Sequence, residues 1–164
     1  QDYAPYVEGV GSAAVFKYKD MMFVAVDAIF DRNGSDNPSD IITCTEFTIP
    51  DREISYLQNE INKNMDVTTK GIVWISHVAL QDIDNASQNK LLNILKGYGL
   101  PMTVFEGHTH IEAYRELVDN ETGNAYCQVY TLPAVVLYNK YPYYNVVFKD
   151  GKVWGIDKHT NGEL

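Results

Sequence analysis

The sequence contains neither a membrane-spanning run nor a basic stripe. No stretch approaches the roughly 20 consecutive apolar residues that a transmembrane helix requires, and the first residues lack the basic-then-apolar pattern of a signal peptide. Lysine and arginine are scarce, since 13 of them face 22 acidic residues, for a formal net charge of −9. Because nucleic-acid backbones are bound by clusters of Lys and Arg, the sequence predicts a soluble chain that binds neither nucleic acid nor a membrane.

Cysteine is almost absent, with only Cys44 and Cys127 in 164 residues. Their spacing is not that of a metal site, which leaves a disulfide or two buried thiols. We favour free thiols, because a domain of this size needs no covalent staple. The chain also opens at Gln1 without an initiator Met. This start suggests a processed or trimmed product, with export and removal of a signal or upstream segment as one such case, and the compartment stays open.

The 45% apolar content and the length predict one globular domain or part of one. Strands are expected at residues 13–18 and 22–28, joined by a turn at Lys19-Asp20. Residues 29–48 are rich in Asn, Asp, Ser and Gly, which predicts a long surface loop. Long loops in compact domains are often functional.

The middle of the chain alternates between helical and strand-like patterns. Apolar positions spaced three and four apart predict helices over residues 51–64 and 86–96. Continuous apolar runs predict buried strands over residues 71–76 and 101–105. This alternation indicates a layered α/β sheet. Antiparallel strands are expected after it, over residues 111–118, 125–132, 143–148 and 152–156, with Asp150-Gly151 as a hairpin turn.

Three of the four histidines follow the two buried strands. His77 comes directly after residues 71–76, and Gly107-His108-Thr109-His110 follows residues 101–105. The carboxyl ends of parallel strands form the edge at which open α/β sheets bind ligands, and imidazole is the commonest ligand of divalent transition metals. Each histidine alone could be an ordinary loop residue, but their joint placement favours a metal site.

These motifs make the chain resemble the second half of calcineurin-like metallophosphoesterases. The similarity consists of Ser76-His77, then Gly107-His108-Thr109-His110, then Thr131-Leu132-Pro133-Ala134, each after a predicted strand. It extends over about residues 9–153 and includes the upstream hairpin that ends in Asp27. The resemblance implies the C-terminal half of an α/β/β/α sandwich, in which a mixed sheet with two helices is followed by antiparallel hairpins. Residues 1–164 are then expected to form a single partial domain.

The resemblance also implies a hydrolase that cleaves a small phosphomonoester or phosphodiester. In that family two divalent metals, Zn, Mn or Fe, clamp the ester and generate the attacking hydroxide. By position, His77 and His108 would bind one metal and His110 the other. Gly107 would let the backbone turn sharply between the ligands, with a plain turn glycine as the alternative. For Asp27 a structural hydrogen-bonding role is expected and not metal ligation.

The other ligand motifs of the family are missing. Its first half supplies an Asp-x-His pair, a bridging Asp in Gly-Asp and an Asn in Asn-His, and neither Gly-Asp nor Asn-His occurs in this chain. The one Asp-x-His, Asp157-Lys158-His159, lies near the chain end, and His159 is interpreted as a solvated terminal residue. A catalytic zinc usually has three protein ligands, and two cations without a bridging carboxylate repel each other. The chain is therefore expected to bind metal weakly at most and to be inactive alone.

Two other functions stay open. One is a non-catalytic binding module of the same fold. The other is a secreted carbohydrate-binding domain, suggested by Tyr138, Tyr141, Tyr143 and Tyr144, although tyrosines at this density more often pack a β-rich core. Under the leading interpretation the partner is a missing N-terminal half or a second copy of the chain, because half of a two-sheet core leaves apolar strand faces uncovered.

Overall fold

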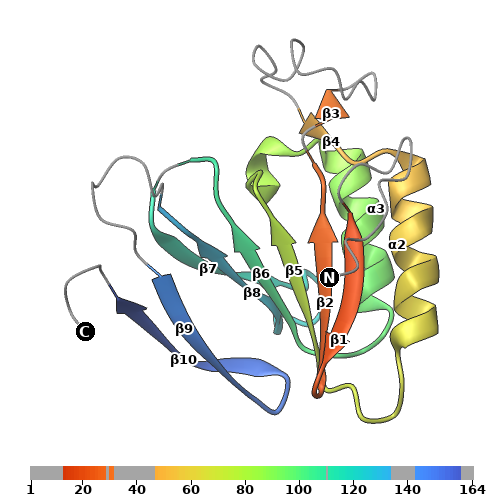
Figure 1. Cartoon of the computed structure of the whole chain (residues 1–164). Helices are drawn as coiled ribbons and strands as arrows, with labels where there is room; N and C mark the ends of the chain where they lie inside the picture. The colour runs from red at the N-terminus through yellow and green to blue at the C-terminus, as the bar shows by residue number, and fades with distance from the viewer. Residues whose placement is uncertain (1–12, 29, 32–46, 110, 134–142, 160–164) are drawn as a thin grey trace, which may run out of the picture.

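The computed structural model describes residues 13–28, 30–31, 47–109, 111–133 and 143–159. Its centre is a six-stranded sheet with the order β1-β2-β5-β6-β8-β7 (Figure 1). The inner strands run parallel, and they are β2 (Met21–Val26), β5 (Gly71–Ser76), β6 (Met102–Glu106) and β8 (Ala125–Thr131). The edge strands β1 (Ala14–Tyr18) and β7 (Ala113–Val118) pair antiparallel. The predicted mixed α/β fold, with two helices and antiparallel hairpins, is confirmed.

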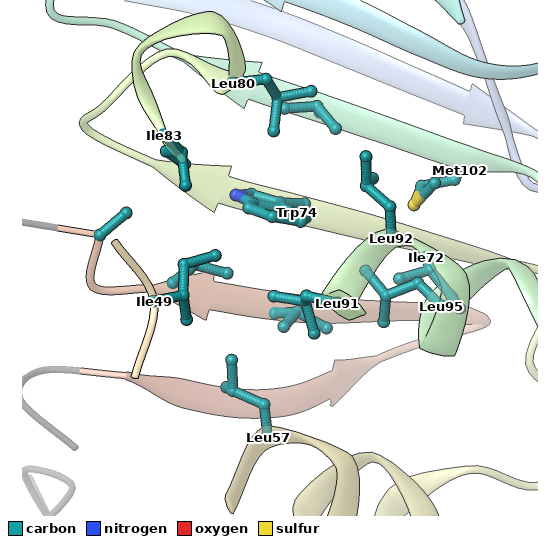
Figure 2. Close-up of a cluster of buried hydrophobic side chains, with 14 of the residues drawn as sticks. Ile49, Leu57, Ile72, Trp74, Leu80, Ile83, Leu91, Leu92, Leu95 and Met102 are labelled. Atoms are coloured by element: carbon teal, nitrogen blue, oxygen red, sulfur yellow. The ribbon is translucent and has the colours of Figure 1, made fainter. Parts of the chain in front are cut away.

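Helices α2 (Asp51–Asn64) and α3 (Asn85–Lys96) cover one face of the sheet. Helix α3 begins where the Asp84 carboxylate accepts hydrogen bonds from the amides of Ala86 and Ser87, at 3.0 and 3.1 Å. Satisfying these first N–H groups stabilises a helix start. The apolar stripes of both helices meet the sheet in one core (Figure 2), which contains the fully buried Trp74 and Leu91.

The loop predicted at residues 29–48 is partly wrong, because its two ends pair with each other. They form the short antiparallel strands β3 (Phe30–Asp31) and β4 (Phe47–Thr48). Residues 32–46 lie outside the described part of the chain. The Phe47 carbonyl also accepts a hydrogen bond from the Asp84 amide at 2.7 Å, which ties β4 to the start of α3. A pairing of two-residue strands leaves no periodic signal in the sequence.

A hairpin of β9 (Tyr143–Lys149) and β10 (Lys152–His159) lies against the other face of the sheet. Strand β10 continues three residues beyond its predicted end. Phe148 meets Phe23 edge to face, with ring centroids 6.3 Å apart, and the Val153 amide donates to the Gln128 side chain at 3.1 Å. The turn of the hairpin thus lies near the amino ends of the parallel strands, and its other end reaches Glu112, just before β7.

The part of the same face next to the carboxyl ends of the strands is open. Ile75 is 40% exposed and Tyr114 is 53% exposed. Between them, Phe105 and Tyr130 stack at 5.5 Å and are half-buried. Apolar and aromatic side chains therefore form an exposed row across β5, β6, β8 and β7, here called the open row and defined as Ile75, Phe105, Tyr130 and Tyr114.

Cys127 of β8 is buried, and its thiol is free. Burial raises the pKa of this thiol to about 12. Cys44 lies outside the described residues. Among the described residues, no helix has the length and apolar content needed to cross a bilayer.

Two glycines allow the hairpin turn to reach the sheet. Gly151, in the β9–β10 turn, has φ +79°, and a Cβ added there would lie 1.9 Å from the Lys70 carbonyl oxygen. A Cβ on Gly71 would lie 2.4 Å from the Gly151 carbonyl oxygen. Backbone therefore packs directly on backbone, a contact that only residues without side chains permit.

This contact predicts a large penalty for a side chain at the turn. We expect Gly151→Ala to lower the free energy of unfolding by about 2–4 kcal/mol, because a left-handed conformation and a backbone clash add together. Gly99→Ala is the matched control, since Gly99 has φ +68° but nothing within 4 Å of the added Cβ. The Gly99→Ala variant should lose only the free energy of placing a side chain in a left-handed backbone conformation, about 1–2 kcal/mol. Urea unfolding measures both losses, and equal losses would contradict the docking contact.

Candidate functional site

His77 and His108 meet at the carboxyl edge of the parallel strands. His77 follows β5, and His108 follows β6 after one glycine. Their ring centroids are 5.4 Å apart at an interplanar angle of 79°. Both side chains are exposed, although most residues just before them are buried. The predicted convergence of these two histidines therefore occurs, while the third predicted ligand, His110, lies outside the described residues.

Gly107 lies where the two strand ends approach closely. Its amide donates to the His77 carbonyl at 3.0 Å. A Cβ at this position would lie 3.2 Å from that carbonyl oxygen and 3.9 Å from Nδ1 of the His77 ring. The residue with positive φ in this segment is His108, at +66°, and not Gly107.

The left-handed conformation of His108 is uncommon for a residue with a side chain. It is accompanied by a hydrogen bond from the Thr109 amide to the Gly107 carbonyl, at 2.8 Å. The ring of Phe47 packs edge to face on His108, with centroids 5.2 Å apart. Conformations of this kind persist only where the surroundings impose them, and they concentrate at functional sites.

The spacing of the two rings suits a shared metal ion. With metal–nitrogen bonds of about 2.0–2.1 Å, two imidazoles on one tetrahedral ion have ring centres roughly 5 Å apart. The observed 5.4 Å is close to this separation. Within the described part of the chain, however, no three His, Cys, Asp or Glu side chains come together as a metal-binding group. These residues fit a two-ligand fragment of a metal site and not a complete one.

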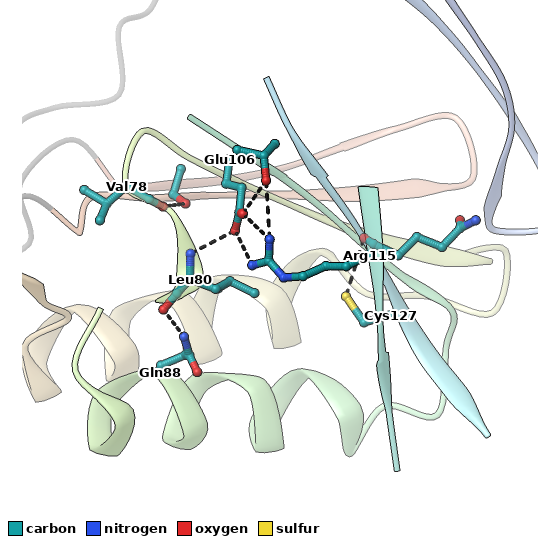
Figure 3. Close-up of polar contacts among 9 residues, drawn as sticks. Val78, Leu80, Gln88, Glu106, Arg115 and Cys127 are labelled. Atoms are coloured by element: carbon teal, nitrogen blue, oxygen red, sulfur yellow. Dashed lines mark hydrogen bonds and ion pairs between the residues drawn. The ribbon is translucent and has the colours of Figure 1, made fainter. Parts of the chain in front are cut away.

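Glu106, the last residue of β6, is a buried charged residue at this edge that the sequence analysis did not single out. Its side chain has no exposed surface and forms a two-pronged ion pair with Arg115, at 2.7 and 3.1 Å (Figure 3). The same carboxylate accepts hydrogen bonds from the Thr131 hydroxyl at 2.7 Å and the Leu80 amide at 2.8 Å. The sequence feature that could have indicated a buried carboxylate is an acidic residue at the end of an apolar strand, directly before Gly107.

A second buried carboxyl lies beside Asp27. The amide of Asp27 donates to Oε1 of Glu53 at 2.9 Å, whereas Oε2 of Glu53 is buried without a hydrogen-bond partner among the described residues. Burial raises the pKa of Glu53 to about 8, and the Asp27 charge acts in the same direction against the hydrogen bond from the Asp27 amide. Glu53 is therefore mostly protonated at neutral pH.

Two other predicted features lie in different places: the Thr131-Leu132-Pro133 segment contacts this edge, whereas His159 lies on the separate hairpin. The Leu132 amide, in the Thr131-Leu132-Pro133 segment, donates to the Glu106 carbonyl at 2.7 Å. His159 belongs to β10 in the separate hairpin, where its ring stacks on Tyr143 at 4.9 Å. The Asn145 amide lies 3.1 Å from Nε2 of His159. His159 is thus packed on its neighbouring strand and is not a merely solvated end.

No family model and no curated protein matches this chain. Among solved structures, the chain is similar to the sulfate thiohydrolase SoxB of Thermus thermophilus in complex with glycerol. The two share 12% sequence identity over 92% of this chain, with a TM-score of 0.46. The chain spans 24% of the length of that protein. A similarity this distant assigns neither a family nor an activity.

The raised pKa of Glu53 predicts a pH dependence of stability. The folded state holds the proton more tightly than the unfolded state, in which the pKa is near the ordinary 4.5. This contribution is complete below that value and is lost as the pH rises towards about 8, with a slope of at most about 1.4 kcal/mol per pH unit.

Glu53→Gln should remove that dependence, because the amide oxygen still accepts from Asp27 and never ionises. We expect the variant to gain stability over the native chain between pH 5 and pH 8. Urea unfolding at a series of pH values measures the difference between the two proteins, which cancels other titrating groups. Parallel curves for the two proteins would show that Glu53 is already ionised in the fold.

Proposed function

We propose that the chain is the C-terminal portion of a metal-dependent phosphoesterase that acts on phosphomonoesters or phosphodiesters, and that it is inactive alone. The observation that carries the proposal is the His77–His108 pair. Two imidazoles lie at metal-binding separation on the ligand-binding edge of a parallel sheet. One of them occupies a left-handed conformation that has no evident purpose in packing the core.

Each residue of the edge has a distinct role in this proposal. His77 and His108 would hold one divalent cation, and His110, by its motif position, would hold the other. The bound metals supply a hydroxide nucleophile and stabilise charge on the phosphoryl oxygens. Gly107 supports the pair by letting the two strand ends approach within a backbone hydrogen bond. Zn, Mn and Fe all suit imidazole ligands.

The rest of the site would come from another segment. Gly-Asp and Asn-His do not occur in the sequence, and its one Asp-x-His, at Asp157-Lys158-His159, lies on the separate hairpin. Another segment would therefore supply the bridging carboxylate and the remaining ligands. The open row offers a surface for it, because exposed apolar side chains run across the sheet up to the edge that carries the histidines. An N-terminal half or a second copy of the chain would cover this surface.

A binding module is the second candidate, and one observation favours it. A cleft of about 310 Å³ lies between β7, β8 and the hairpin, and its lining includes Tyr114, Tyr130 and Tyr144. At its rim, Lys158 forms an ion pair with Glu112 at 2.5 Å. Aromatic faces beside paired charges suit a neutral sugar, whereas Tyr138 and Tyr141 lie outside the described residues. Saturation-transfer NMR with neutral saccharides would detect such a ligand without any metal.

The metal site predicts weak, histidine-dependent binding. We expect Zn²⁺ or Mn²⁺ to bind with a dissociation constant above the micromolar range, because at most two ligands reach one ion. His108→Ala should weaken binding by about tenfold or more, since even outer-shell losses have effects of this size. His159→Ala, on the separate hairpin, is the control and should change nothing. Titration calorimetry tests this, and two tight sites per chain would show that further ligands had been overlooked.

The missing bridging carboxylate predicts an absence of turnover. Hydrolysis of p-nitrophenyl phosphate and of its bis-ester should stay at background with Zn²⁺, Mn²⁺ or Fe²⁺, because no complete two-metal centre can form. A colorimetric assay at high protein concentration provides the measurement. Robust turnover that disappears in His110→Ala would contradict inactivity of the chain alone while supporting the assigned metal site.

A further inference from the structure

We propose that Glu106 is a positioning residue: its buried carboxylate fixes the segment carrying His77 relative to the segment carrying His108. That this role supports metal binding by His77 and His108 rests on the proposed function. The role itself concerns only how two segments of this chain are held together, and the metal-free protein can test it.

Two contacts join the segments at separate points. The first is the hydrogen bond from the Gly107 amide to the His77 carbonyl, at 3.0 Å. The second is the hydrogen bond from the Leu80 amide to Oε2 of Glu106, at 2.8 Å. They add to the β5–β6 ladder, which ends at the pair Ile75–Phe105, and to the Gln88 side chain, which donates to the Leu80 carbonyl. Two contacts three residues apart fix both its distance and its direction, and the second depends entirely on the Glu106 side chain.

Only a carboxylate satisfies this position. The groups facing Glu106 are donors: the Leu80 amide, both terminal nitrogens of Arg115 and the Thr131 hydroxyl. An ionised carboxylate accepts on both oxygens, whereas a glutamine amide would turn its own donors towards other donors. Arg115 balances the buried charge with a two-pronged geometry, which is the strongest form of this interaction.

The histidines depend on this support because their own side chains are exposed. The His108 ring packs on Phe47, and the separation of the two rings also depends on the backbones that carry them. His108 also holds a left-handed conformation that its surroundings must impose. A buried, fully hydrogen-bonded carboxylate one residue from Gly107 provides a fixed point of this kind.

Amide hydrogen exchange on the metal-free chain tests the inference. We expect Glu106→Gln to speed exchange at Gly107 at least about tenfold more than at core amides such as Val104, which corresponds to local opening of one linking contact. Leu95→Ala is the control for global destabilisation, because Leu95 is buried in α3 near Met102, away from the histidine edge (Figure 2). It should speed exchange at Gly107 and Val104 by the same factor.

A double variant covers the case in which Glu106→Gln does not fold. Glu106→Met with Arg115→Met leaves no uncompensated buried charge, and such replacements are usually tolerated. It still removes the acceptor of the Leu80 amide, so the same selective loss at Gly107 is expected. If the exchange rates at Gly107 and Val104 rise by the same factor in both Glu106→Gln and the double variant, the positioning role is overturned.

A Co²⁺ titration followed by paramagnetic shifts separates this inference from the proposed function. If the native chain binds Co²⁺ through His77 and His108, Glu106→Gln should weaken binding at least about threefold, whereas Leu95→Ala should leave it unchanged. Unchanged Co²⁺ affinity in Glu106→Gln would overturn the positioning role and leave the metal site standing. Absence of Co²⁺ binding to the native chain, with selective exchange at Gly107 retained, would overturn the proposed function and leave the positioning role standing.

Discussion

The carboxyl edge of the sheet depends on the burial of one charge, that of Glu106. Removing an ionised carboxylate from water is costly unless every lone pair finds a donor. Glu106 meets this condition with donors from three separate segments, namely the turn after His77, strand β7 and the end of β8. Because these three segments must place their donors against the Glu106 carboxylate, their positions relative to β6 are fixed. Gly107 and His108 follow Glu106 directly, so the geometry of the histidine pair is set by electrostatics in the core beneath it.

The hairpin and the helices divide the sheet into surfaces of different character. Helices α2 and α3 cover one face, and the β9–β10 hairpin lies against part of the other. The backbone contact between Gly71 and Gly151 anchors that hairpin at the amino ends of the strands. The open row, defined by Ile75, Phe105, Tyr130 and Tyr114, therefore borders the same edge as His77 and His108. A partner that covers this row would lie next to the two histidines, so the proposed metal site and the exposed apolar row could be completed by the same segment.

Much of the fold could be predicted from the sequence because local periodicity and strand direction determine it. Apolar spacing predicted both helices within about a residue, and the rule that parallel strands end at one edge predicted that His77 and His108 converge. The unforeseen features depend on contacts distant in sequence. The β3–β4 pairing, the donors that gather on Glu106 and the left-handed His108 have no periodic pattern. Gly107 was singled out as a turn residue, and the structure adds that it lies close to the His77 carbonyl, a contact with no sequence signal.

The two buried carboxyls at this edge bear on the proposed metal site, because neither offers it a free negative charge. Two neighbouring divalent ions need nearby negative charge to offset their repulsion. The charge of Glu106 is neutralised by the guanidinium of Arg115. Glu53, with a pKa of about 8, is mostly uncharged at neutral pH. Neither buried group therefore contributes charge to a metal beside His77 and His108, even though the chain as a whole carries −9. Under the proposed function, a carboxylate from the segment that covers the open row would supply the negative charge that the two metals need.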